Sequence, residues 1–235
     1  MLHRGEPFPD CHVRTVLKGI RRIKGDVVNR KLPITLEILR AIHKAVDLSQ
    51  PSGATFWAVC LTSFFGMLRK SSLFPPSGYG VPLIRHVKVC NECLVVSFSY
   101  SKTVQCKQRQ PFVVLPMYQD HPELCPVRAL VHAWLLAGIT SLSQPLLPIT
   151  NSCGTIKAMT GFQYQRLFKS VMAKLSLHGY STHSFRRGGA THALYRGVPA
   201  EIIMAQGDWK SLSYLDYLHV NVVRSRSTEI KKMFL

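Results

Sequence analysis

Residues 54–73 constrain the fold of this 235-residue chain more than any other stretch. They read A-T-F-W-A-V-C-L-T-S-F-F-G-M-L-R-K-S-S-L and are apolar on nearly every side until Arg69. A helix of this kind has no polar face to turn toward water, so other elements must surround it. A charge at its end is costly to bury unless it meets a partner or faces a site. The stretch therefore predicts a central helix that ends near a functional arginine; the alternative is an ordinary cation favoured by the helix dipole.

A second stretch, from His183 to Tyr217, predicts three consecutive short helices. Residues whose side chains end in polar groups are placed along them among apolar neighbours. It reads H-S-F-R-R-G-G-A-T-H-A-L-Y-R-G-V-P-A-E-I-I-M-A-Q-G-D-W-K-S-L-S-Y-L-D-Y. His183 and Arg186 share a helix face, whereas Arg187 is turned about a third of a revolution away. Side chains of these types can grip a phosphate and attack it. The helix boundaries are marked by glycines and a proline in the order typical of real helices, at Gly197, Pro199 and Gly207.

The charge balance points to an anionic partner. The chain has 30 Lys and Arg against 12 Asp and Glu, a formal net charge of +18. Such an excess favours nucleic acid over a membrane surface, an acidic protein or a merely solvated basic surface. No apolar run approaches the roughly 18 residues of a membrane span. Arg4, Glu6 and Asp10 interrupt the start, so we expect no signal peptide and a soluble intracellular protein.

Cysteine usage fits a reducing compartment. Seven cysteines, an odd number, are scattered along the chain and suit buried thiols better than a disulfide framework. Cys90 and Cys93 form one C-x-x-C, but no second ligand pair stands at a suitable spacing for zinc. We therefore interpret V-C-N-E-C-L as a hairpin turn with its tip near Asn91 and Glu92.

Residues 1–32 read as a basic N-terminal arm or linker, loosely patterned, which is either solvated or lies on a DNA backbone. Residues 33–235 then form one larger domain. Thr35 is its first candidate helix cap, followed by apolar residues at helical spacing to about Val46.

Three alternating stretches predict a three-stranded antiparallel sheet: L-I-R-H-V-K-V, L-V-V-S-F-S-Y-S and Q-P-F-V-V-L-P. A basic turn, S-K-T-V-Q-C-K-Q-R-Q, separates the second from the third. Downstream we expect a helix near Pro126, a surface loop over residues 138–159, and a helix capped by Thr160. The first of these helices is predicted to bury Val127, Leu130, Val131, Trp134 and Leu135.

The motifs of the two opening stretches resemble those of the tyrosine recombinase (phage integrase) superfamily. H-x-x-R, A-T-H, G-x-W and a tyrosine follow in the family's order, and G-M-L-R-K-S-S-L resembles its first arginine motif, G-L-R-x-S-E-L. This sequence departs at Ser72, where the family usually has glutamate. The sequence G-D-W-K-S and the spacing between Trp209 and Tyr217 resemble those of the eukaryotic Crypton and tyrosine-recombinase retroelement branch.

The resemblance assigns roles to residues of this chain. It implies that Arg69 and Arg186 hold the scissile phosphate and that Tyr217 attacks it. Tyr214, one turn earlier, is a rival nucleophile. It also places a lysine that protonates the leaving oxygen on the basic hairpin turn, where Lys102 fits by position.

Lys107 is the alternative proton donor on that turn. His183 would assist proton movement at the tyrosine, and Trp209 would donate its indole N–H to a phosphate oxygen. We interpret His192, in A-T-H, as structural.

The implied protein is mainly α with a small three-stranded antiparallel sheet (α+β), the tyrosine recombinase catalytic-domain fold. It would cleave and rejoin double-stranded DNA through a 3′-phosphotyrosine, with no cofactor and no metal, and would self-associate on DNA as a tetrameric synapse. The family's N-terminal core-binding domain is expected to be absent, and residues 218–235 to dock on a neighbouring subunit. We expect a nuclear location if the chain is eukaryotic, and otherwise the cytoplasm or nucleoid. The alternatives are a non-catalytic DNA-binding protein derived from a recombinase and a type IB topoisomerase.

Overall fold

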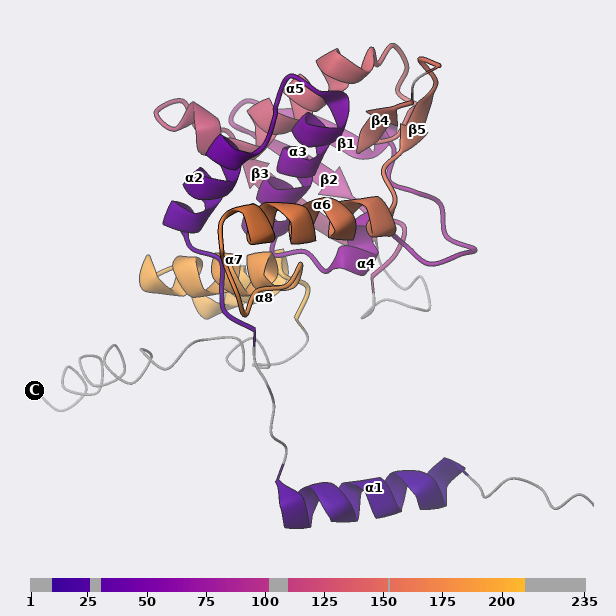
Figure 1. The fold of residues 1–235 in the computed structure, drawn as a ribbon, viewed down its shortest axis with the longest axis vertical. Helices are drawn as coiled ribbons and strands as arrows, with labels where there is room; N and C mark the ends of the chain where they lie inside the picture. Colours follow the sequence, from indigo (N-terminus) through magenta and orange to yellow (C-terminus); the bar gives the residue numbers. More distant parts are fainter. Residues whose placement is uncertain (1–9, 26–30, 102–109, 152, 210–235) are drawn as a thin grey trace, which may run out of the picture. The chain divides into compact units, whose positions relative to one another are not determined.

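The computed structural model describes residues 10–25, 31–101, 110–151 and 153–209. The chain divides into two compact units, residues 1–30 and residues 31–235. The larger unit is mostly helical with two small antiparallel sheets, as Figure 1 shows. Its helices and strands are α2 (Leu36–Ala45), α3 (Pro51–Phe65), α4 (Lys70–Leu73), η1 (Ile84–His86), β1 (Val87–Cys90), β2 (Cys93–Ser97), β3 (Phe112–Pro116), η2 (Pro122–Leu124), α5 (Pro126–Ala137), β4 (Pro148–Thr150), β5 (Ile156–Ala158), α6 (Gly161–Lys174), α7 (Ser184–Tyr195) and α8 (Ala200–Gln206).

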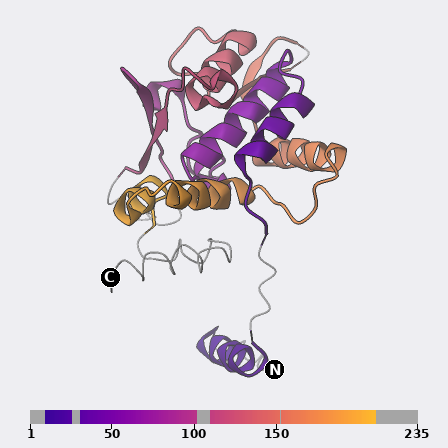
Figure 2. The same cartoon turned by 90° about the vertical axis from the view of Figure 1, so that its left-hand side faces the viewer.

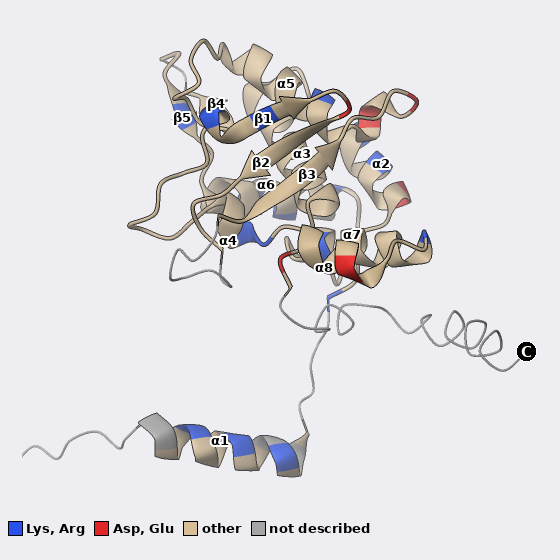
Figure 3. Cartoon of the chain, turned by 180° about the vertical axis from the view of Figure 1, so that it is seen from behind, with Lys and Arg blue, Asp and Glu red and all other residues tan. Residues whose placement is uncertain are grey.

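The smaller unit contains helix α1, Asp10–Lys24, where the sequence analysis expected a loosely patterned arm. Basic residues recur along it (Figure 3). Between them, apolar side chains follow a helical spacing and stay largely exposed: Val13, Val16, Leu17, Ile20 and Ile23. The segment is therefore an amphipathic helix, in which apolar residues at a 3.6-residue period alternate with basic ones.

Helix α3 forms the centre of the larger unit, as predicted. Its residues from Gly53 to Phe64 are all buried, and it packs against α5, α7 and β4. Figure 2 shows α7 crossing the end of α3. The helix is shorter than predicted, because Met67 adopts a left-handed conformation (φ 47°) and ends the helical path. Arg69 therefore lies in an extended conformation just before α4.

The predicted three-stranded sheet is present, in the order β1-β2-β3. Cys90 pairs with Cys93, so Asn91 and Glu92 form the hairpin tip as expected. A second sheet, β4 paired with β5, occupies part of residues 138–159, where we expected only a surface loop. That expectation was wrong because strands of three residues are too short to show an alternating pattern.

Helices α5 and α6 start where the sequence predicts. Cys125 caps α5, Gly138 ends it in a left-handed conformation (φ 69°), and Thr160 forms a capping box with Gln163 at the start of α6. The predicted inner face of α5 was only partly right. Val127 and Leu130 are buried and Trp134 is half-buried, but Val131 is 40% and Leu135 74% exposed. Small residues, Ala129 and Ala133, take the buried places instead.

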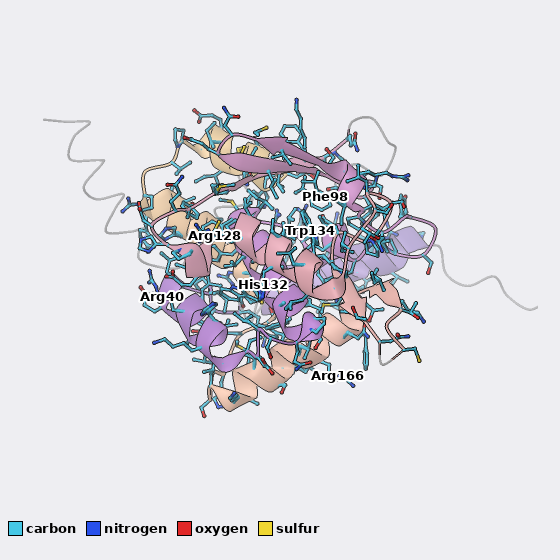
Figure 4. The ribbon with its side chains drawn as sticks, turned by 90° about the horizontal axis from the view of Figure 1, so that it is seen from above. Arg40, Phe98, Arg128, His132, Trp134 and Arg166 are labelled. Atoms are coloured by element: carbon cyan, nitrogen blue, oxygen red, sulfur yellow. The ribbon has the colours of Figure 1, made fainter. Side chains whose placement is uncertain are left out.

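Trp134 is held on α5 through a contact with the loop that leads to β4. Its indole Nε1 donates a hydrogen bond of 2.8 Å to the carbonyl oxygen of Leu146, which is itself fully buried. Figure 4 shows Trp134 on α5, with Phe98 nearer the sheet. The residues predicted to form a loop thus contribute to the core.

Helix α7 approaches its neighbours so closely that two of its residues must be glycine. A Cβ on Gly188 would lie 2.0 Å from the carbonyl oxygen of Ile34, and one on Gly189 would lie 2.0 Å from that of Phe64. The segment before α2 also contacts α7, because the Ile34 N–H donates a hydrogen bond of 3.0 Å to the carbonyl oxygen of Ser184. The glycine pair therefore fixes the position of α7, and hence of the functional residues on it.

We predict that Gly189→Ala destabilises the protein by about 1–3 kcal/mol, because the added methyl meets backbone that cannot rotate away. Urea unfolding followed by circular dichroism measures this. Gly80→Ala is the matched control: no atom lies within 4 Å of its Cβ position, so we expect a change within about 0.5 kcal/mol. Equal stability of the two variants would contradict the close approach.

Candidate active site

Arg186 is the largest fully buried side chain in the described part of the protein, with 1% exposure. Its Nη1 donates hydrogen bonds to two carbonyl oxygens, those of Met67 and of Gly207, the latter at 2.7 Å. Its Cζ lies 3.7 Å from the centroid of the Trp209 ring, a cation–π distance. One guanidinium on α7 therefore joins the turn that follows α3 to the turn that follows α8.

Trp209 lies against this guanidinium in a small apolar cluster with Met67, Ala190 and Ile203. It is 6% exposed. Gly207 makes room for it, since a Cβ there would lie 1.7 Å from a ring carbon of Trp209. The backbone N–H of Trp209 donates to the Met204 carbonyl at 2.9 Å, which ties the ring to α8.

His183 stands at the N-terminal end of α7, directly before Ser184. Burial, and after it the positive charges of Arg186, Arg69 and Arg187 in that order, lower the pKa of its imidazole from 6.5 to about 4. All these causes disfavour the charged ring. His183 is therefore neutral at physiological pH and can accept a proton.

Arg69 precedes α4 with extended backbone angles (φ −78°, ψ 146°) and is half-buried. Its charge acts on His183, as the lowered pKa of that histidine records. Ser72, three residues on, is 6% exposed, so the position that is usually glutamate in the resembled family is an interior one here.

The structure thus brings together four of the predicted site residues, from segments far apart in sequence: Arg69, His183, Arg186 and Trp209. The remaining predicted residues, together with the two alternatives weighed for them, lie outside the described ranges: Lys102, Lys107, Tyr214 and Tyr217. Two arginines beside a neutral histidine form an arrangement that can bind an oxyanion and take up a proton next to it.

Three residues at this site were missed or misjudged in the sequence analysis. Arg187 was expected to turn away, yet it is 4% exposed and its charge acts on His183. Gln206 and Asp208 contact other elements through their side chains. No local pattern identifies these last two, because their partners are distant in sequence.

His192, near the C-terminal end of α7, packs close to Phe64. Its ring centroid is 6.1 Å from that of Phe64, and burial lowers its pKa. It lines an apolar pocket of about 710 Å³ that also includes Phe65, Val114 and Ile202. A structural role for His192 stays a prediction.

Within the described ranges, no group of three or more His, Cys, Asp and Glu side chains could hold a metal ion. The same part of the chain contains no helix that is both long enough and apolar enough to span a bilayer.

Comparison with known proteins gives one relative in sequence and several in fold. No family model matches the chain. A curated relative described as an integrase/recombinase XerD homologue from Selenomonas ruminantium is 27% identical over 224 residues, which cover 88% of this chain and 59% of the relative. The chain therefore spans little more than half of that protein's length.

Solved recombinase structures share its architecture. The XerA recombinase superposes with a TM-score of 0.59 at 14% identity, covering 88% of this chain and 65% of that one. The XerH site-specific recombinase bound to its difH substrate gives 0.58 at 16% identity, covering 84% and 53%. This chain has the tyrosine recombinase catalytic-domain fold. In sequence, the chain is similar to the XerD homologue over most of its own length.

The pKa of His183 predicts a pH dependence of stability. The folded pKa of about 4 lies below the 6.5 of the unfolded chain, so the unfolded state binds more protons between these values. The contribution of His183 is therefore fully present above about pH 6.5 and is lost as the pH falls toward 4. Urea unfolding at a series of pH values should show a shallower acid loss for His183→Gln.

His132→Gln is the control, since His132 is exposed on α5 (Figure 4) and should leave the acid loss unchanged. If the His183 ring titrated near pH 6.5 by NMR, the buried position between arginines would be wrong.

Proposed function

We propose that this chain is a tyrosine recombinase catalytic domain that cleaves and rejoins double-stranded DNA through a 3′-phosphotyrosine. One observation carries the proposal: Arg69, Arg186 and the neutral His183 converge, with Trp209 packed on Arg186. The likeness to XerD and Xer recombinases supports site-specific cleavage and rejoining as the reaction. Because the chain covers only part of its relatives, the activity is proposed for this domain.

In the proposed reaction the Tyr217 hydroxyl attacks the scissile phosphorus. A phosphorus–oxygen bond to the tyrosine forms as the bond to the 5′ oxygen breaks, and that oxygen leaves as a hydroxyl. The energy of the phosphodiester is kept in the covalent link, so reversal by another strand's hydroxyl rejoins DNA without ATP. Arg69 and Arg186 would neutralise the non-bridging oxygens, where charge builds in the transition state.

Two protons move in this reaction. His183 would assist the movement of the proton that the tyrosine loses, and its lowered pKa, which keeps the ring neutral, supports this role. Lys102 would return a proton to the leaving oxygen, with Lys107 as the alternative donor. Trp209 would orient Arg186 through ring contact and hold α8 in place.

The nucleophile can be tested by one substitution. Tyr217→Phe removes a single oxygen, so folding and DNA affinity should change little while covalent attachment disappears. The measurement is a denaturing gel of protein mixed with a labelled, nicked suicide duplex, on which a phosphotyrosine link survives detergent. Tyr214→Phe is the matched control and should retain the adduct.

The reverse pattern would make Tyr214 the nucleophile. If the unmodified protein formed no adduct on any duplex, even with a separate core-binding domain supplied, the non-catalytic DNA-binding alternative would replace the proposal. The interior Ser72, in place of a glutamate, is one feature that favours that alternative.

We predict that DNA binding by this chain depends steeply on salt and weakly on sequence. Its net charge of +18 favours contacts with phosphates, which release counterions and do not distinguish bases. Fluorescence anisotropy on two unrelated duplexes over a salt series measures both properties. A hundredfold preference for one duplex at fixed salt would contradict the prediction.

We also propose four properties for which the support is the sequence resemblance alone. G-D-W-K-S and the spacing from Trp209 to Tyr217 favour the Crypton and retroelement branch, and with it a transposable element and a nuclear location. Self-association into a tetrameric synapse on DNA follows from the same resemblance. Sedimentation of the protein bound to a duplex tests the last, and a monomer at every occupancy would exclude it.

A further inference from the structure

The hairpin between β1 and β2 places two thiols directly opposite each other. Cys90 ends β1 and Cys93 begins β2, and the register pairs these two residues across the antiparallel strands. Side chains of residues paired in this way lie on the same face of a sheet. The Cα atoms of such a pair are typically about 4.5–5.5 Å apart, within the range of about 4.4–6.8 Å that a disulfide requires. The register therefore lets one covalent bond join the two sulfur atoms without a shift of the backbone.

The two cysteine side chains also contact each other. The pKa of the Cys93 thiol is raised by partial burial, then by the charge of Cys90, a hydrogen bond with the Cys90 side chain and the charge of Glu92. The hydrogen bond places the two side chains next to each other, as the strand register requires. Strand pairing and side-chain contact thus bring the same two thiols together.

This hairpin is accessible to a small molecule and is held in place on one side. Both cysteines are half-buried, and the tip residues Asn91 and Glu92 are exposed. Strand β2 also pairs with β3, and the Met117 N–H donates a hydrogen bond of 2.8 Å to the carbonyl oxygen of Glu92. Figure 3 shows the three strands side by side. The sheet therefore fixes the tip, while the thiols can be reached from solvent.

Three other cysteines with described side chains provide a comparison. Cys60 and Cys125 are fully buried, and burial raises the pKa of the Cys60 thiol well above its usual range. Neither thiol is accessible to a reagent in the folded protein. Cys153 is exposed. It therefore serves as an accessible thiol outside the hairpin.

We propose that Cys90 and Cys93 form a redox-active dithiol, which a small-molecule disulfide such as oxidised glutathione converts reversibly into an intramolecular disulfide. One cysteine thiolate attacks a sulfur of the oxidant, forms a mixed disulfide and releases one glutathione thiol. The second thiolate attacks the protein sulfur of that mixed disulfide and releases the second glutathione thiol. The two cysteines lose two electrons and two protons in all, which the oxidant takes up. The new bond joins β1 to β2 beside the hairpin tip, and the proposal is independent of the DNA chemistry.

The test equilibrates the full chain with buffers of oxidised and reduced glutathione, blocks the remaining thiols with an alkylating reagent, and analyses the tryptic peptides by mass spectrometry. Both cysteines lie in one tryptic peptide, residues 89–102, because Lys88 and Lys102 enclose a stretch without lysine or arginine. We expect this peptide to lose two hydrogens and to gain no alkyl group. The thiol of Cys153 should instead gain glutathione or the alkyl group.

The same equilibration in concentrated urea separates the folded arrangement from closeness in sequence, since two cysteines three positions apart can also meet in an unfolded chain. We expect the folded protein to favour the disulfide about tenfold more than the unfolded chain, which is about 30 mV for this two-electron couple. The rate of oxidation should rise with pH through the neutral range, because the raised pKa of the Cys93 thiol leaves little thiolate there.

Three variants serve as controls. Cys90→Ser and Cys93→Ser each leave one thiol in the hairpin, so each should take up one glutathione on the 89–102 peptide and lose no hydrogens. Cys153→Ser is the matched control and should form the hairpin disulfide as the unmodified protein does.

Three outcomes would overturn the proposal. The first is alkylation of both Cys90 and Cys93 even in the most oxidising buffer. The second is a disulfide that joins two different tryptic peptides in place of one within residues 89–102. The third is an equal equilibrium constant in buffer and in urea, which would show that the strand register contributes nothing to the reaction.

Discussion

The buried guanidinium of Arg186 is the interaction on which the site depends. Placing a charge in the interior costs several kcal/mol unless hydrogen bonds and a favourable environment compensate. Here the carbonyl oxygens of Met67 and Gly207 and the face of Trp209 provide that compensation. Met67 follows α3, whereas Gly207 and Trp209 follow α8. The buried charge of Arg186 is therefore compensated only when α3, α7 and α8 are packed together.

The backbone is shaped to make this meeting possible. Met67 and Asp208, which lie in the two turns around Arg186, both adopt left-handed conformations that cost most residues about 1–2 kcal/mol. Gly188 and Gly189 let α7 approach the backbone of its neighbours. The conformational free energy that these left-handed residues cost is thus offset by the contacts that Arg186 and Trp209 make in the assembled core. The same contacts offset the loss of side-chain packing at Gly188 and Gly189, where α7 crosses its neighbours.

Much of the fold was predictable because its signals are local. The apolar stretch that became α3, the cap at Thr35, the capping box at Thr160 and the hairpin tip between Cys90 and Cys93 each depend on residues a few positions apart. The predicted inner face of α5 was partly wrong, because it depends on packing. Val131 and Leu135 fit a helical stripe but point to solvent, because α5 packs through its alanines against α3.

The sequence by itself determined which residue types stand at the site and in what order, and it placed Arg186 on a helix. It also placed Arg69 at the end of the central helix, whereas Arg69 lies in extended backbone before α4. Only the tertiary structure decided what these residues do to one another. The pKa of His183 falls to about 4 because the ring is largely buried and because the positive charges of three arginines act on it. Ser101 forms a hydrogen bond with Asp208, 107 positions away in sequence, and Arg186 forms one with Met67, 119 positions away. Desolvation and charge act through space, so their effects follow from the folded arrangement and not from spacing along the chain.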